Sequence, residues 1–192
     1  MKFNNETLKL AVKAWAEDEV TAENKYGHIS DWDTSEVTDM SRLFIGAESF
    51  NQPLEKWDVS QVTDMFGMFS HAKSFNQPLE GWDVSNVKNM AAMFQKARSF
   101  NQPIEKWNVS QVMNMCGMFS EAESFNQPLE KWDVSYVTYM SRMFDAAESF
   151  NQPLDKWNVG NAADMSEMFW GGWQVNSLIN TLETSFNKKS ER

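Results

Sequence analysis

A tryptophan recurs every 25 residues through most of this 192-residue chain, and this spacing constrains the fold more than any other feature. The recurring residues are Trp32, Trp57, Trp82, Trp107, Trp132 and Trp157. A methionine, a phenylalanine and the segment Ser-Phe-Asn-Gln-Pro keep the same period, and all five prolines fall at one position of it. A unit this short cannot enclose its own hydrophobic core, so successive units must stack on one another.

The repeat boundaries predict one domain in three parts. Residues 1–31 form an N-terminal helical cap, residues 32–169 hold five full repeats and one partial repeat, and residues 170–192 form a C-terminal helical cap and tail. The first cap is predicted as a helix over 5–17, because Leu8, Val12 and Trp15 follow helical spacing. The second is predicted as a helix over 176–186 for the same reason.

Each repeat is predicted to contain one short strand and one short helix. Trp57 and Val59 alternate with polar residues, as in a strand with one buried face. Val62, Met65 and Phe69 then follow with the spacing of a helix. The expected fold is therefore an α/β repeat solenoid similar to leucine-rich repeats, a right-handed stack of 25-residue coils with helical caps.

The repeat resembles a known family. The string Trp-Asp-Val-Ser-x-Val-x-x-Met-x-x-Met-Phe-x-x-Ala-x-Ser-Phe-Asn-Gln-Pro-Leu is similar to the 25-residue repeat of BspA-like leucine-rich-repeat surface proteins. The same unit, called the palindromic amphipathic repeat, occurs in mycoplasma-type surface lipoproteins. The resemblance covers 32–169, and Tyr26-Gly27-His28-Ile29-Ser30-Asp31 resembles the family's entry into the first coil. It implies a solenoid with a binding or adhesion role and no catalytic residues.

Charge and composition exclude several functional classes. With 17 Lys and Arg against 27 Asp and Glu, the net charge of −10 argues against a nucleic-acid partner. One cysteine allows neither an internal disulfide nor a thiolate zinc site. No apolar run is long enough to span a membrane, and the N-terminal residues lack the pattern of a secretory signal. The resemblance favours the cell surface, whereas the missing signal pattern leaves a cytoplasmic location open.

Catalytic, metal and cofactor sites are not expected. His28, His71 and Cys116 occupy repeat or entry positions that tolerate other residue types elsewhere, so each is interpreted as structural. A six-residue spacing of carboxylates, such as Asp33 with Asp39, suggests calcium as one alternative. Capping of backbone N–H groups is the preferred interpretation, because Asp and Asn interchange at those positions. The Met, Trp and Asn columns are interpreted as structural ladders.

Positions at which the repeats differ are the predicted binding residues, because the architecture does not dictate them. The candidates are Phe66, Lys73, Lys88, Lys96, Arg98, Met113, Tyr136, Tyr139 and Arg142. The sequence predicts a non-catalytic scaffold that binds a protein or a surface glycan through these outer residues. A self-assembling homodimer or fibre, joined through an apolar stripe of Ile45, Phe66, Met113 and Cys116, is the alternative. A calcium-dependent adhesin is a weaker alternative.

Overall fold

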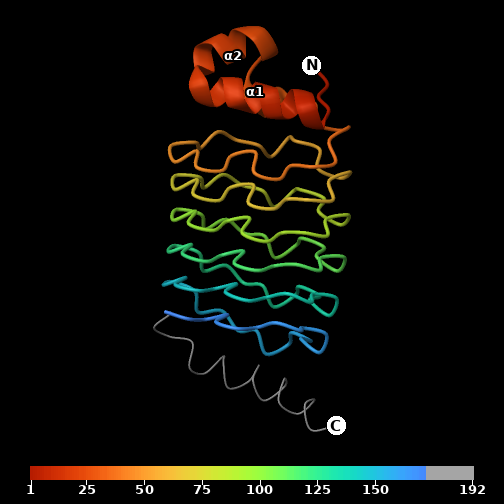
Figure 1. Cartoon of the computed structure of the whole chain (residues 1–192), viewed down its shortest axis with the longest axis vertical. Coiled ribbons are helices and arrows are strands. Elements are labelled where there is room, and N and C mark those ends of the chain that lie inside the picture. The colour runs from red at the N-terminus through yellow and green to blue at the C-terminus, as the bar shows by residue number, and fades with distance from the viewer. Residues whose placement is uncertain (172–192) are drawn as a thin grey trace.

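A computed structural model describes residues 1–171 as a cap of helices followed by a stack of coils. The helices are α1 (Asn5–Glu17), α2 (Glu19–Tyr26) and the short 3-10 helix η1 (Ile29–Asp31). Below them, successive coils lie one beneath another, coloured from orange to blue (Figure 1). We number the coils 1 to 5 as 32–56, 57–81, 82–106, 107–131 and 132–156, and coil 6 begins at 157. The predicted helix over 176–186 lies outside the described residues.

The predicted N-terminal helix is present over the expected residues, and local sequence sets both of its ends. Asn4 and Thr7 form a capping box at the first turn. The Asn4 side chain accepts the backbone N–H of Thr7, and the Thr7 side chain accepts the backbone N–H of Asn4. Leu8, Ala11, Val12 and Trp15 are buried toward coil 1. The chain turns at Asp18, whose side chain accepts the N–H of Thr21 and so caps α2.

The predicted strand and helix in each coil are wrong, and with them the α/β solenoid. Residues 32–171 contain no α-helix and no strand, only turns and single-residue parallel bridges. Those bridges join equivalent positions of successive coils in an unbroken series: Asp39 to Asp64, Asp64 to Asn89, Asn89 to Asn114, Asn114 to Tyr139 and Tyr139 to Asp164. The 25-residue stacking is therefore present, but its coils are built from turns.

Backbone conformation explains why no helix forms. Two positions in each coil, four residues apart, have positive φ between 50° and 75°. The first is occupied by Arg42, Gly67, Ala92, Gly117, Arg142 and Glu167, and the second by Gly46, His71, Lys96, Glu121, Ala146 and Gly171. A left-handed residue cannot continue a right-handed helix, and it is required at the third position of a type II turn. Each coil thus makes consecutive tight turns where the apolar spacing resembles that of a helix.

Two kinds of backbone hydrogen bond alternate along this turn segment. In coil 2, the N–H groups of Met65, Gly67 and Phe69 donate to carbonyl oxygens of coil 3 at 2.9 Å. The intervening N–H groups bond locally, as when Met68 donates to the carbonyl of Met65 at 3.2 Å. The N–H groups of one coil therefore point toward the next coil, and the carbonyl groups of that next coil point back.

Aromatic ladders fill the interior, as the repeated columns predict. Phe69 stacks on Phe94 with ring centroids 5.6 Å apart, and Trp82 stacks on Trp107 at 6.5 Å. The predicted amide ladder is also present, because the Asn76 Oδ1 atom accepts the N–H of Asn101 at 3.0 Å. These inter-coil contacts make each coil dependent on its neighbours for burial.

Asp and Asn side chains stabilise the turns in place of the predicted helix caps. The Asp58 carboxylate accepts the N–H of Ser60 at 2.9 Å, and the Asp64 carboxylate accepts the N–H of Phe66 at 2.7 Å. Asn108 does the same for Ser110 without a charge. At the position shared by Asp58 and Asn108, an acceptor oxygen is thus what the turn uses, with or without a charge, as expected from the sequence, although it closes a turn and not a helix.

Candidate interaction surfaces

Four of the predicted binding residues gather on one face of coils 3 to 5. The backbone N–H of Met113 donates to the carbonyl of Lys88 at 2.9 Å, and the N–H of Tyr139 donates to the carbonyl of Met113 at 3.2 Å. Tyr136 lies three residues before Tyr139 on the same coil. We call Lys88, Met113, Tyr136 and Tyr139 the aromatic patch.

The side chains of the aromatic patch extend into solvent. Tyr136 is 59% exposed, Tyr139 is 49% exposed and Met113 is 43% exposed. Their orientation follows from the alternation of the coil, in which Val137 and Met140 are buried and the residues between them are not. Lys88 is exposed and has no ion-pair partner among residues 1–171. The patch therefore combines aromatic and apolar surface with one unpaired cation.

The predicted basic residues outside the patch are neutralised by the next coil or the previous one. Lys73 pairs with Glu48 at 2.8 Å, Lys96 with Glu121 at 3.3 Å and Arg98 with Glu123 at 3.0 Å. Arg142 pairs with Glu167. Because exposed pairs of this kind contribute little to stability, their main effect is to cancel charge. The structure therefore does not bring these cations together as a free basic surface.

The predicted apolar stripe is not continuous. Phe66 is half-buried beneath Arg42, whose guanidinium lies 4.9 Å from the ring centroid. Cys116 is half-buried as well, and its sulfur accepts a hydrogen bond from the Ser141 hydroxyl at 3.2 Å. Ile45 is 52% exposed, but it lies in coil 1, far along the stack from Met113 in coil 4.

Both histidines have structural contacts. The Nδ1 atom of His28 lies 2.7 Å from the Ser30 hydroxyl and caps η1, while its ring packs edge-on against Trp15. The Nδ1 atom of His71 lies 3.0 Å from the Ser70 hydroxyl. Within residues 1–171, no three His, Cys, Asp or Glu side chains are grouped as metal ligands. Among the same residues, no helix is long and apolar enough to cross a membrane.

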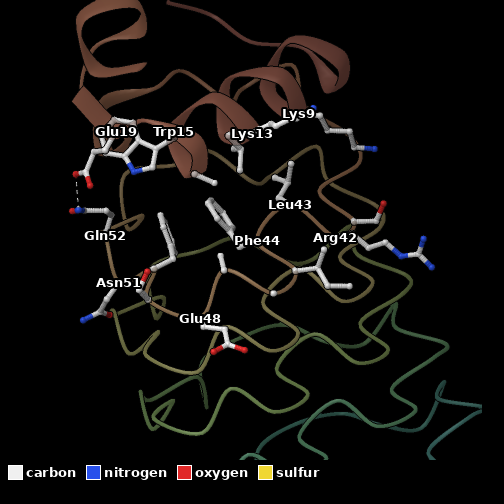
Figure 2. A pocket seen from close by; sticks show the side chains of 18 residues that line it. Lys9, Lys13, Trp15, Glu19, Arg42, Leu43, Phe44, Glu48, Asn51 and Gln52 are labelled. Carbon is white, nitrogen blue, oxygen red and sulfur yellow. Dashed lines mark hydrogen bonds between the residues drawn. The ribbon is translucent and has the colours of Figure 1, made fainter. Parts of the chain in front are cut away.

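A cavity of about 900 Å³, which was not predicted from the sequence, opens between α1 and coil 1. Figure 2 shows Lys13 and Trp15 above it and Arg42, Phe44 and Gln52 below. We call this cavity the cap groove; it is lined by α1, the start of α2 and residues 41–52. The groove forms because coil 1 packs against α1 and not against a preceding coil. The only sequence signal for it was exposed Ile45 at a position that is polar in coils 2 to 5.

Ionic and polar contacts tie the cap to coil 1 at both ends of the groove. The Lys9 ammonium lies 2.8 Å from the Asp39 carboxylate, and the Gln52 amide donates to Glu19 at 3.0 Å. Partial burial acts to raise the pKa of Asp39, but the hydrogen bonds from Lys9 and Ser41 outweigh it, so the pKa is lowered. Asp39 is thus held ionised beside Lys9.

The chain matches a family model described as "Mycoplasma protein of unknown function, DUF285" over residues 13–116 and again over 102–191. It belongs to the DUF285 family. Membership in DUF285 confirms the mycoplasma part of the resemblance, whereas a BspA-like leucine-rich repeat is not supported by this match. No curated protein and no solved structure matches the chain.

Proposed function

We propose that this DUF285 protein is a non-catalytic repeat scaffold that binds another protein through the aromatic patch. Tyr is among the residue types that most often anchor interfaces, and Met adapts to irregular surfaces. Here two tyrosines and one methionine are exposed together beside Lys88. No packing requirement places them there, because other coils carry Glu, Gln or Asn at the position of Tyr136 and Thr, Lys or Ala at the position of Met113.

The single observation that carries the proposal is a local hydrogen bond that Tyr139 cannot make. At the equivalent position, the other five coils use an Asp or Asn side chain to accept the N–H two residues later. Tyr139 replaces that acceptor with an exposed phenol ring. A residue that breaks a local rule without an internal gain is typical of a functional surface.

The absence of catalysis is part of the proposal. The two histidines lie in different parts of the stack, and each contacts a serine beside it in sequence. Cys116 contacts Ser141 in the next coil. These separate, locally bonded groups do not make the nucleophile and base pair that covalent catalysis uses.

Self-association through the ends of the stack is the less favoured alternative. α1 lies across coil 1 and buries Leu8, Val12 and Trp15, so a second copy cannot place a whole coil there without displacing the cap (Figure 1). The interrupted apolar stripe gives a side-by-side dimer little continuous surface. Sedimentation over a concentration series tests this alternative directly.

The test of the proposal compares a double variant, Tyr136→Ala with Tyr139→Ala, with the wild-type chain. Biotinylated chains are used to capture proteins from an extract of the native host, and recovered proteins are quantified by mass spectrometry. We expect at least one protein whose recovery falls about tenfold or more in the double variant, as for loss of an interface anchor. The matched control is Gln61→Ala, because Gln61 occupies in coil 2 the position that Tyr136 occupies in coil 5.

A glycan array probed with the same three chains separates the two partner classes. Binding to immobilised glycans that depends on the tyrosines would identify a sugar partner and replace the protein proposal. If wild-type, double-variant and control chains capture the same proteins in equal amounts and bind no glycan, the aromatic patch is not a binding site.

A further inference from the structure

The first coil has carbonyl groups that lack the donors used everywhere else in the stack. The N–H groups of Arg42, Phe44 and Gly46 in coil 1 donate to coil 2, whose acceptors are the carbonyl oxygens of Phe66, Met68 and Ser70 at 2.8–2.9 Å. The equivalent acceptors of coil 1 are the carbonyl oxygens of Ser41, Leu43 and Ile45. Among residues 1–171, no N–H group or side chain donates to these three oxygens.

These three carbonyl groups face the cap groove. In every later coil the equivalent groups point toward the preceding coil, and in coil 1 that direction leads to α1. Ser41, Leu43 and Ile45 all line the groove, as Figure 2 shows for Leu43. Backbone carbonyls at every second residue form a row of acceptors, as at the open edge of a sheet.

Apolar surface lies beside this row of acceptors. Phe50 is only partly buried, whereas its equivalents Phe75, Phe100 and Phe125 are fully buried by neighbouring coils. Leu43 and Ala47 are also partly buried. An occupant of the groove could therefore bury apolar side chains as well as satisfy the carbonyl groups.

Arg42, at the rim of the cap groove, carries a positive charge without an ion-pair partner among the described residues. Arg42 has no carboxylate within ion-pair distance among residues 1–171, although its guanidinium packs on Phe66. At the equivalent position of coil 5, Arg142 pairs with Glu167 of coil 6. Arg42 lines the groove, so an acidic side chain bound there would attract its guanidinium away from Phe66 of coil 2.

We propose that the cap groove binds a short peptide segment of a partner protein, whose backbone N–H groups pair with the carbonyl oxygens of Ser41, Leu43 and Ile45. The segment has about five residues, since three acceptors at alternate positions require that length. It carries a glutamate or aspartate facing Arg42 and apolar side chains toward Phe50. The binding mode continues the hydrogen-bonded interface that already joins each coil to the next.

The probe is a synthetic peptide that copies residues 164–171, Asp-Met-Ser-Glu-Met-Phe-Trp-Gly, with blocked ends. Its positions copying Glu167, Phe169 and Gly171 are equivalent to Arg42, Phe44 and Gly46, whose N–H groups donate to the following coil, and its glutamate copies the partner of Arg142. Titration into isotope-labelled chain, followed by NMR, is expected to shift amide signals in residues 41–50 and in α1. If no such shifts are observed at millimolar peptide concentration, the proposal is wrong.

Methylation of the peptide backbone distinguishes this hydrogen-bonded binding mode from non-specific binding. Methyl groups on the nitrogens of the copies of Glu167, Phe169 and Gly171 remove the three donors, and we expect affinity to fall at least tenfold. Methyl groups on the copies of Ser166, Met168 and Trp170 leave those donors in place, and affinity should stay higher than with the first set. Equal affinity for the two methylated peptides contradicts the proposed pairing.

Two charge reversals separate the cap groove from the aromatic patch. Arg42→Glu should weaken peptide binding about tenfold, whereas Lys88→Glu should not change it, because Lys88 lies on coil 3. Circular dichroism checks that both variants fold. If Arg42→Glu instead abolishes self-association of the full chain in sedimentation, the occupant is a second copy and the partner-peptide proposal fails.

Discussion

The indole N–H of Trp107, at the start of coil 4, donates a hydrogen bond to the carbonyl oxygen of Leu79, near the end of coil 2, at 2.9 Å. The same bond, over the same 28 positions of sequence, recurs from Trp57, Trp82, Trp132 and Trp157. Each of these indoles therefore donates to a backbone carbonyl, and the ring of Trp107 also stacks on Trp82 and Trp132 in the neighbouring coils. The repeated tryptophan thus bonds polar backbone and fills the core at once.

Replacing Trp107 with Phe should lower the free energy of unfolding by about 2–4 kcal/mol. The change leaves the carbonyl of Leu79 without its donor in a buried place and opens a small cavity. Urea unfolding followed by circular dichroism measures the loss. Trp170→Phe is the control, because Trp170 is 69% exposed and its replacement should cost less than about 0.5 kcal/mol.

The sequence predicted the period, the stacking, the first cap helix and the inward columns, but not the form of the coils. Apolar residues three and four apart indicate a helix, yet consecutive tight turns bring the same residues to one side. Gly67 and Gly117 were the available signal for positive φ. Arg42 and Arg142 at the equivalent position concealed it, because non-glycine residues seldom adopt that conformation.

Two glycine-to-alanine changes should have opposite effects on stability. Gly117 has a φ of +59°, and an added Cβ would meet only Ser120 at an ordinary 3.8 Å, so Gly117→Ala should cost about 1 kcal/mol through backbone strain. Gly81 lacks positive φ and has open space around it, so Gly81→Ala should stabilise the chain by about 0.5 kcal/mol. Urea midpoints measure both, and a loss of equal size at the two positions contradicts the turn assignment.

Acid sensitivity should decrease when Asp83 and Asp133 are both replaced by Asn. Hydrogen bonds from the Ser85 and Ser135 side chains, then from their backbone N–H groups, lower the pKa of each aspartate. A lowered folded pKa stabilises the fold above the unfolded value of about 3.9, and this stabilisation is lost as pH falls through the folded value. Asn keeps the acceptor oxygen without titrating, as Asn108 does naturally.

The measurement for the aspartate variant is the urea midpoint at pH 7, 4 and 3. We expect little change at pH 7 and a smaller drop between pH 4 and pH 3 than in the wild-type chain. An unchanged drop would mean that these two carboxylates are not linked to folding.

The candidate surfaces were only partly predictable from sequence. Tyr136, Tyr139, Met113 and Lys88 were identified because they vary between repeats, but their grouping required the inter-coil pairing of Lys88 with Met113 and of Met113 with Tyr139. Lys73, Lys96 and Arg98 were identified by the same rule, yet each meets a glutamate in an adjoining coil. Sequence variation between repeats alone does not distinguish a free charged side chain from one that is paired with an opposite charge in an adjoining coil.

Tyr139→Asn should stabilise the chain while weakening partner binding. Asn restores the acceptor for the N–H two residues later, as Asn114 provides for Cys116 at 3.0 Å, and a hydrogen bond of this kind contributes about 0.5–1.5 kcal/mol. Urea unfolding measures the gain, and the host-extract capture described above measures the loss. The reciprocal variant Asn114→Tyr should lose a similar amount of stability. A Tyr139→Asn chain that is less stable than wild type would show that Tyr139 has a structural role and would contradict its proposed role in binding.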